Sequence, residues 1–394
     1  MPNRNVIGIM LVITFASVAL RQYALTTVCA LALLPLLVAY GWRRWALRAV
    51  VFERTLDAGR IFPGDAVAMT TSITNRKLLP LTRLDVSDTI PDGIDVVGEE
   101  LMSAGRPGRK TFIRSLRLGW YEALSRRYEL RCVARGLYRF GPVQLRSGDP
   151  FGFGQVEAEH AVESRLLVYP RLLPPSELGF EMRQLLGTIR SQQRLVVDPA
   201  RTIGVRDYHR DDPLKSIHWN ATARRGELQT RLYEPVTALQ IMCFLDISTF
   251  EKTYQGIQRD QAERLISMAA TVCKELTDAR HAVGLWSNAA SAEGGTAVRL
   301  PPSRNPQQAG RILATLAQLT LYAGPTISHT IALAQASLSN TTTIVLISAI
   351  STAEIRATLA RLRGAGYAVL WIALSQIKPA VPKIIVFHAP LEGM

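Results

Sequence analysis

The first 42 residues form two apolar runs that carry almost no charge. Val6–Leu20 contains no charged side chain, Arg21 follows it, and Tyr23–Trp42 is again uncharged. The second run is long enough to cross the hydrocarbon core of a bilayer as a helix. The first run is shorter, and Arg21 extends it by snorkelling toward the headgroups.

These two runs predict a transmembrane helical hairpin in residues 1–49, with helices at about 6–21 and 23–42. A cleaved signal peptide is an alternative for the first run, but no A-x-A-like site precedes a polar start. A second alternative is a pair of buried core helices.

Between residues 50 and 170 the apolar positions follow a period of two. Val67–Thr74 alternates apolar and polar side chains, and Tyr128–Cys132 does the same, as expected for half-buried strands. Pro91–Gly93 is a strong turn signal. Several short strands with turns between them predict a β-sandwich of immunoglobulin-like type.

From residue 238 to 394 apolar strands alternate with amphipathic helices. The first strand, from Ala238 to Asp246, is almost wholly apolar, as in a buried parallel strand. The further expected elements are a helix at Asp260–Arg280, a strand at Val283–Trp286, helices at Pro306–Tyr322 and Ile327–Leu338, a strand at Thr343–Ile347, a helix at Ala353–Arg363, and strands at Tyr367–Leu374 and Lys383–His388. This order predicts a doubly wound α/β domain.

The expected fold class is therefore multidomain, α/β plus β. A crossover segment at 171–237, with a short helix at Gly179–Ser191, joins the sandwich to the α/β domain.

The chain of 394 residues has a formal net charge of +14. Such a charge suits nucleic acid, an anionic membrane surface or an acidic partner. The apolar runs favour the membrane. Many arginines fall between Arg106 and Arg146, so a solvated basic face and contact with headgroups or an acidic protein stay open; no nucleic-acid recognition motif accompanies them.

Basic residues flank the apolar runs on both sides. Arg4 precedes them, Arg43, Arg44 and Arg48 follow them, and only Arg21 lies between. The positive-inside rule predicts that both ends, and the soluble domains, face the cytoplasm.

The four cysteines lack C-x-x-C spacing, which favours reduced thiols over a disulfide framework or a zinc site. They are Cys29, Cys132, Cys243 and Cys273.

A charge-rich segment at 205–233 surrounds two aromatic residues, Tyr208 and Trp219, with ions of both signs. Large rings gain most when they are buried. Pairs such as Arg206 or Arg224 with Asp207 or Asp211 predict a network that clamps the two soluble domains. A docking surface for an acidic or nucleotide-loaded partner is the alternative.

The same segment resembles the signature of the bacterial family called domain of unknown function 58. The matching residues are Arg206, Asp207, Tyr208, Asp211, Ile217, Trp219, Ala223 and Arg224, while Arg210 and Lys215 depart from the pattern. Arg135–Phe153 also resembles this family. Its glycines and prolines fix turns, its aromatic residues are expected to pack, and Asp149 is expected to cap a turn.

The resemblance implies a von Willebrand factor A-like module at the C-terminal end. Its metal corner would be formed by Asp246 and Ser248, with Thr326 from a later loop. Phe250 and Ala349 stand where the pattern has a serine and an aspartate. The resemblance thus implies at most a degenerate Mg²⁺ site, and the alternative is that Asp246 and Ser248 bond to loop backbone.

No catalytic motif such as G-x-S-x-G, a P-loop or H-E-x-x-H occurs. We therefore expect no enzyme and no resident cofactor. The resemblance implies a membrane-anchored adaptor or assembly protein of the bacterial inner membrane, with a MoxR-type AAA+ ATPase as partner and other von Willebrand A proteins as further partners. The alternative is a membrane-tethered polyanion or nucleic-acid binder that uses the basic β-domain.

Overall fold

The computed structural model describes residues 4–103, 105, 107–192, 197–209, 212–235, 240–292, 294, 297–339, 341–374 and 384–390. The chain divides into two compact units, Met1–Tyr169 and Pro170–Met394.

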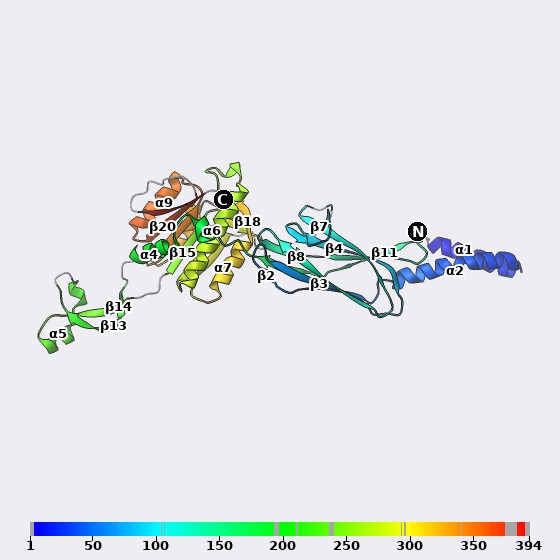
Figure 1. The fold of residues 1–394 in the computed structure, drawn as a ribbon, viewed down its shortest axis with the longest axis horizontal. Helices are drawn as coiled ribbons and strands as arrows, with labels where there is room; N and C mark the ends of the chain where they lie inside the picture. Colours follow the sequence, from blue (N-terminus) through cyan, green and yellow to red (C-terminus); the bar gives the residue numbers. More distant parts are fainter. Residues whose placement is uncertain are drawn as a thin grey trace. The chain divides into compact units, whose positions relative to one another are not determined.

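The first unit begins with two helices, α1 (Arg4–Ala19) and α2 (Tyr23–Trp45), which pack against each other (Figure 1). Thr26 Oγ1 donates to Ser17 Oγ at 3.1 Å across the pair. Among the described residues α2 is the one helix long and apolar enough to cross a membrane, because α1 spans 16 residues. Both expected helices therefore form, but only the second has the length of a membrane span.

Twelve β-strands follow among the described residues of the first unit. They are β1 (Val50–Leu56), β2 (Arg60–Ile61), β3 (Ala66–Asn75), β4 (Leu81–Pro91), β5 (Ile94–Val96), β6 (Met102–Ser103), β7 (Arg109–Leu118), β8 (Ala123–Cys132), β9 (Gly136–Phe140), β10 (Val143–Gly148), β11 (Gln155–His160) and β12 (Ser164–Val168). They form sheets in the orders β1-β3-β8-β5, β11-β10-β4-β7-β6 and β2-β12-β9.

The predicted alternation in this unit is confirmed, because β3 buries every second residue from Val67 to Asn75. The expected turn cap is also confirmed: the Asp149 carboxylate accepts from the backbone N–H groups of Phe151, Phe153 and Gly154. Phe151 and Phe153 are more exposed than expected; they stack on each other at the surface.

Two buried polar contacts join the two larger sheets. Arg54 on β1 donates to Asp88 on β4 at 2.5 Å, and both side chains are fully buried. Arg114 on β7 donates to the Tyr128 hydroxyl and to Thr71 Oγ1 of the opposite sheet. Burial raises the pKa of Asp88 to about 6, although the Arg54 and Arg114 charges oppose the rise.

The second unit is built on one main sheet whose central strands run parallel. Its elements are α3 (Pro175–Leu178), α4 (Met182–Gln192), β13 (Val197–Asp207), α5 (Trp219–Arg225), β14 (Gln229–Pro235), β15 (Gln240–Leu245), α6 (Arg259–Asp278), β16 (Ala282–Ser291), β17 (Ala297–Ser303), α7 (Gln308–Ala317), β18 (Leu319–Ala323), α8 (Ile327–Gln335), β19 (Thr343–Ser348), α9 (Ala353–Gly364), β20 (Ala368–Leu374) and β21 (Ile385–Ala389).

The main sheet has the order β17-β16-β15-β19-β20-β21, and β16, β15, β19, β20 and β21 run parallel. Residues of α8 and α9 pack on one face, against Phe244, Leu346 and Trp371. On the other face α6 packs against β15 and places Cys273 beside Cys243. Helices thus cover both faces, which explains why the strands are apolar throughout (Figure 1). All four cysteines are buried free thiols.

Two expected helices have different bounds in the structure. The helix expected at Pro306–Tyr322 stops at Ala317, because Leu319–Ala323 pairs as strand β18 with an extension of β16. The helix expected at Gly179–Ser191 forms as α4 but begins at Met182, because Gly179, with a φ of 75°, ends the preceding helix α3. A Cβ on Gly179 would lie 2.6 Å from Pro390, so only glycine fits there.

Candidate functional site: the carboxyl edge of the parallel sheet

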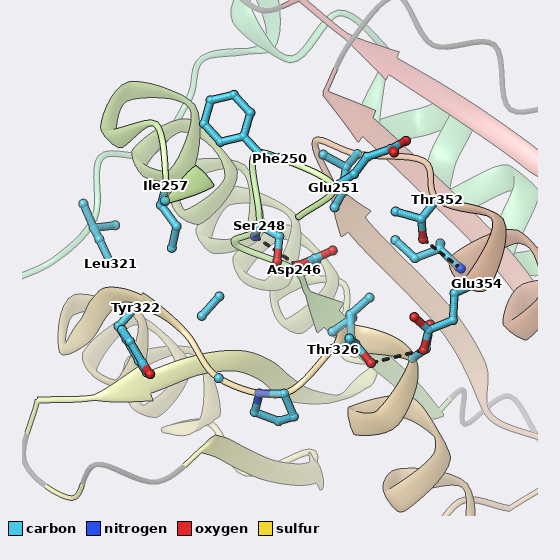
Figure 2. Close-up of a pocket in the computed structure, with 18 residues that line it drawn as sticks. Asp246, Ser248, Phe250, Glu251, Ile257, Leu321, Tyr322, Thr326, Thr352 and Glu354 are labelled. Atoms are coloured by element: carbon cyan, nitrogen blue, oxygen red, sulfur yellow. Dashed lines mark hydrogen bonds between the residues drawn. The ribbon is translucent and has the colours of Figure 1, made fainter. Parts of the chain in front are cut away.

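The candidate site lies where the parallel strands β15 and β19 end. Asp246 and Ser248 follow β15 directly, and Thr326 begins α8 after β18. All three residues line one cavity of about 230 Å³ (Figure 2). The structure thus brings the three predicted site residues to one place, at the strand ends where α/β sheets bind ligands.

Asp246 lies buried at the bottom of this cavity. Its side chain is 1% exposed, and Oδ1 accepts from the Ser248 backbone N–H at 3.0 Å and from Asn288 Nδ2 at 2.7 Å. Its second oxygen, Oδ2, is buried without a hydrogen-bond partner. Burial raises the pKa of Asp246, and the bonds from Ser248 and Asn288 partly oppose this rise.

Asn288 is a site residue that the sequence analysis did not find. Its Nδ2 group donates to Asp246 Oδ1 and also to Ser248 Oγ, at 3.1 Å. Its Oδ1 accepts from the backbone N–H of Ile247 at 3.0 Å. A sequence signal existed, because Asn288 follows an expected apolar strand just as Asp246 does, and parallel strands end at the same edge.

Glu354 is the second site residue that was missed. Thr326 Oγ1 accepts from the His329 backbone N–H at 3.3 Å, which caps α8, and donates to Glu354 Oε1 at 3.2 Å. Glu354 lies in the first turn of α9, where a carboxylate interacts favourably with the helix dipole. Figure 2 shows this bond between Thr326 and Glu354, which lie at the starts of α8 and α9.

The cavity wall combines carboxylates, hydroxyls and apolar side chains. Glu251 lines it together with Asp246 and Glu354, and no Lys, Arg or His lies among its described lining residues. Its apolar wall contains Phe250, Ile257, Leu321, Tyr322, Ile327, Ile350 and Ile355.

These residues do not fit a magnesium ion well. The Asn288 amide already donates to both Asp246 Oδ1 and Ser248 Oγ, so each of these oxygens has an N–H group where a cation would approach. Phe250 and Ala349 contribute no ligand oxygen from their side chains. Across the described residues no group of three or more His, Cys, Asp or Glu side chains is arranged to hold a metal.

The charge-rich segment forms a small hairpin rather than an irregular crossover. β13 and β14 pair antiparallel, with Asp207 opposite Gln229, and α5 lies between them in sequence. His218 Nδ1 accepts from the Ala221 N–H and so begins α5, and Gly226, with a φ of 74°, ends it. The sequence shows no strand period at this point, because the consecutive β13 residues Arg206 and Asp207 are both charged and both exposed.

Among the described residues, the ion pairs of this hairpin are not the predicted pairs of Asp207 with Arg206 or Arg224. Arg206 pairs with Asp212 at 2.7 Å, and Arg225 lies 3.6 Å from Asp207. The His209 N–H and Arg206 lower the pKa of Asp212. Asp211, which the prediction used, lies outside the described residues, as does Arg210.

Of the two aromatic residues in the hairpin, one agrees with expectation and one differs. Tyr208 is half-buried and its hydroxyl donates to the Asp212 carbonyl at 3.2 Å, so it does anchor the loop. Trp219, in contrast, is 66% exposed. Lys215 and Arg224 are exposed as well. The role of this hairpin as a clamp between domains stays a prediction.

Comparison with known proteins gives a partial match. Residues 204–379 match the family model described as Protein of unknown function DUF58. The matched span includes the charge-rich hairpin and the cavity residues.

The curated protein "Uncharacterized protein YeaD" of Bacillus subtilis (strain 168) is 25% identical over 243 residues. The match covers 62% of this chain and 57% of that protein, so the chain spans less than two thirds of the relative.

Similarity to solved structures is low. The CARDB domain of the PF1109 protein from Pyrococcus furiosus matches with a TM-score of 0.21 and 11% identity, over 30% of this chain and 91% of that domain. A cohesin module of a family 33 glycoside hydrolase from Clostridium perfringens matches with the same TM-score and identity, over 30% of this chain and 96% of the module. Scores of this size support no conclusion on fold or function.

Proposed function

We propose that the protein is a membrane-anchored, non-enzymatic adaptor or assembly protein that docks a MoxR-type AAA+ ATPase. In this proposal α2 anchors the chain in a bacterial inner membrane, and the soluble units face the cytoplasm. The β unit is an immunoglobulin-like spacer, and the second unit is a von Willebrand A-like docking domain that works without a resident metal.

The observation that carries the proposal is the aromatic surface at the carboxyl edge of the parallel sheet. Tyr322 and Phe250 line the cavity and are 69% and 39% exposed, and Tyr254 of the same loop as Phe250 is 80% exposed. Exposed tyrosines beside a pocket are typical anchor residues of protein interfaces. They supply large contact area at a low cost in conformational entropy.

The anchor is supported by the composition and length of α2. Its 23 residues extend about 35 Å at 1.5 Å per residue, enough for a bilayer core of about 30 Å. Arg43 and Arg44 lie in its last turn, where they favour the cytoplasmic leaflet.

The test is affinity capture of the detergent-solubilised full chain from its own cells. We expect the wild type to recover a MoxR-type ATPase, and Tyr322→Ala and Tyr254→Ala to recover at most about a tenth as much. Tyr121→Ala is the matched control, because Tyr121 is 66% exposed but lies in the first unit. Failure of the wild type to recover any AAA+ ATPase would refute the proposal.

The alternative function is binding of a polyanion by the basic β unit. Several arginines of this unit are paired with acids: Arg127 with Asp57 at 4.0 Å, and Arg146 with Glu157 at 2.7 Å. These pairs reduce the positive charge available to a polyanion. Salt-sensitive binding of heparin or DNA, with no ATPase recovered, would favour this alternative.

A further inference from the structure

The cavity at the sheet edge is acidic in a chain that is strongly basic. Asp246 lies at its base and Glu251 and Glu354 at its exposed edge, and no basic side chain lies among its described lining residues. The chain as a whole carries a net charge of +14. The electrostatic potential of this cavity therefore favours a cationic group, the reverse of what the net charge suggests.

Two buried polar atoms of the cavity lack partners. Asp246 Oδ2 has no hydrogen bond, in a side chain that is 1% exposed. Ser328 Oγ, in the first turn of α8, is also buried and unpaired. Buried polar atoms in folded proteins nearly always have a hydrogen-bond partner. Two such atoms without partners in one cavity therefore indicate a ligand that supplies hydrogen bonds.

The volume of the cavity selects the size of the ligand. At about 230 Å³ it is smaller than the roughly 300–1,000 Å³ typical of sites for whole small molecules. Ile257, Leu321 and Ile350 provide an apolar wall. Such a wall suits the alkyl stem of a long side chain whose charged end reaches a carboxylate.

We propose that this cavity binds an arginine side chain of the docked partner. The guanidinium donates to Asp246 Oδ2 at the base, its stem lies on the apolar wall, and Glu251 and Glu354 attract it at the entrance. Arginine suits the site better than lysine, because its planar fork offers several N–H donors in fixed directions. A site that held a metal ion would instead attract a carboxylate of the partner. The charge of the preferred ligand therefore distinguishes an arginine site from a metal site.

This inference rests on the proposed docking of a partner at the same edge, and its test uses a different probe. The peptide acetyl-Gly-Arg-Gly-amide is added to the detergent-solubilised full chain, and saturation-transfer NMR measures its binding. Three analogues replace arginine by citrulline, lysine or glutamate. We expect the arginine peptide to bind and the neutral citrulline peptide to bind at least about tenfold more weakly.

Variants locate the binding in the cavity. Asp246→Asn, which keeps the shape of the side chain, and Glu354→Gln should each weaken the arginine peptide, the first by about tenfold. Asp278→Asn, an exposed aspartate on α6, is the matched control and should leave binding unchanged.

Three results would overturn the inference: no binding of the arginine peptide to the wild type, equal binding of the citrulline peptide, or preferential binding of the glutamate peptide in the presence of Mg²⁺. The last result would favour a metal site. If the peptide fails to bind while Tyr322→Ala still loses the ATPase, the arginine site is refuted and the proposed function stands. If the peptide binds but no ATPase is recovered, the arginine site stands and the proposed function is refuted.

Discussion

Asn288 Nδ2 lies 2.7 Å from Asp246 Oδ1, and both side chains are 1% exposed. The amide of Asn288 thus donates an N–H group to this buried carboxylate. It also fixes the loop, because its Oδ1 accepts from Ile247 N.

Replacing Asn288 with alanine should destabilise the second unit. The change leaves the Ile247 N–H without its acceptor and removes a donor from Asp246, at a cost of about 1–3 kcal/mol. Thermal denaturation of the solubilised chain should show that the midpoint of unfolding, Tm, falls by several degrees. Asn220→Ala, at an exposed position of α5, is the control and should leave the transition unchanged.

Asp246→Asn should change the dependence of stability on pH. Burial raises the folded-state pKa of Asp246, so the native chain holds this proton at pH values where the unfolded chain has lost it. The free energy of unfolding therefore falls as pH rises from about 3.9, the ordinary value for aspartate, through the folded value. The asparagine variant lacks this loss.

The measurement is thermal denaturation of both chains at a series of pH values from about pH 4, near the ordinary pKa of aspartate, to about pH 8. The variant should be the more stable chain at the upper end, and the difference should shrink toward the lower end. A variant that is less stable near neutral pH would mean that the Asp246 carboxylate makes a favourable contact in the native state.

Removing one partner of the ion pair between Arg54 and Asp88 should strongly destabilise the first unit. Asp88→Ala leaves a fully buried guanidinium without its partner, which costs about 3–5 kcal/mol. Glu157→Ala breaks the pair with Arg146, whose side chains are 50% and 60% exposed, and should cost at most about 1 kcal/mol. Denaturant unfolding of the first unit distinguishes them, and equal effects would contradict the assignment.

Trp371 and Trp219, both in the second unit, should differ sharply in their effect on stability. Trp371 is fully buried and its Nε1 donates to Ser348 Oγ at 2.9 Å, so Trp371→Ala should cost about 3–5 kcal/mol. Trp219 is 66% exposed, and Trp219→Ala should stay within about 0.5 kcal/mol. Unfolding curves of both variants give the comparison, and a large effect at Trp219 would restore the idea of a buried anchor.

The strands and helices of both units could be predicted where one period dominates. Val67–Thr74 alternates because one face of β3 is buried, and α6 was expected at Asp260–Arg280 because its apolar residues repeat at helical spacing. The helix expected at Pro306–Tyr322 was too long, because the pairing of Leu319–Ala323 with β16 is a contact between distant residues. Helical spacing in the sequence does not reveal such pairing.

The residues of the candidate site also fall into those that were predicted from the sequence and those that were not. Asp246, Ser248 and Thr326 were predicted because their segments resemble the metal corner of von Willebrand A modules. Asn288 and Glu354 were missed, since each is ordinary in its own segment and acquires its role from a residue about 30 to 40 positions away.

The sequence by itself determined the apolar N-terminal helix, the change from period two to alternating strands and helices, and the order of the elements, because these depend on local side-chain spacing. Only the tertiary structure decided which polar residues meet at the sheet edge, which ions pair in the charge-rich hairpin and that Trp219 is exposed. These depend on burial and on packing between distant segments, which bring carboxylates and their partners together irrespective of their separation in the chain.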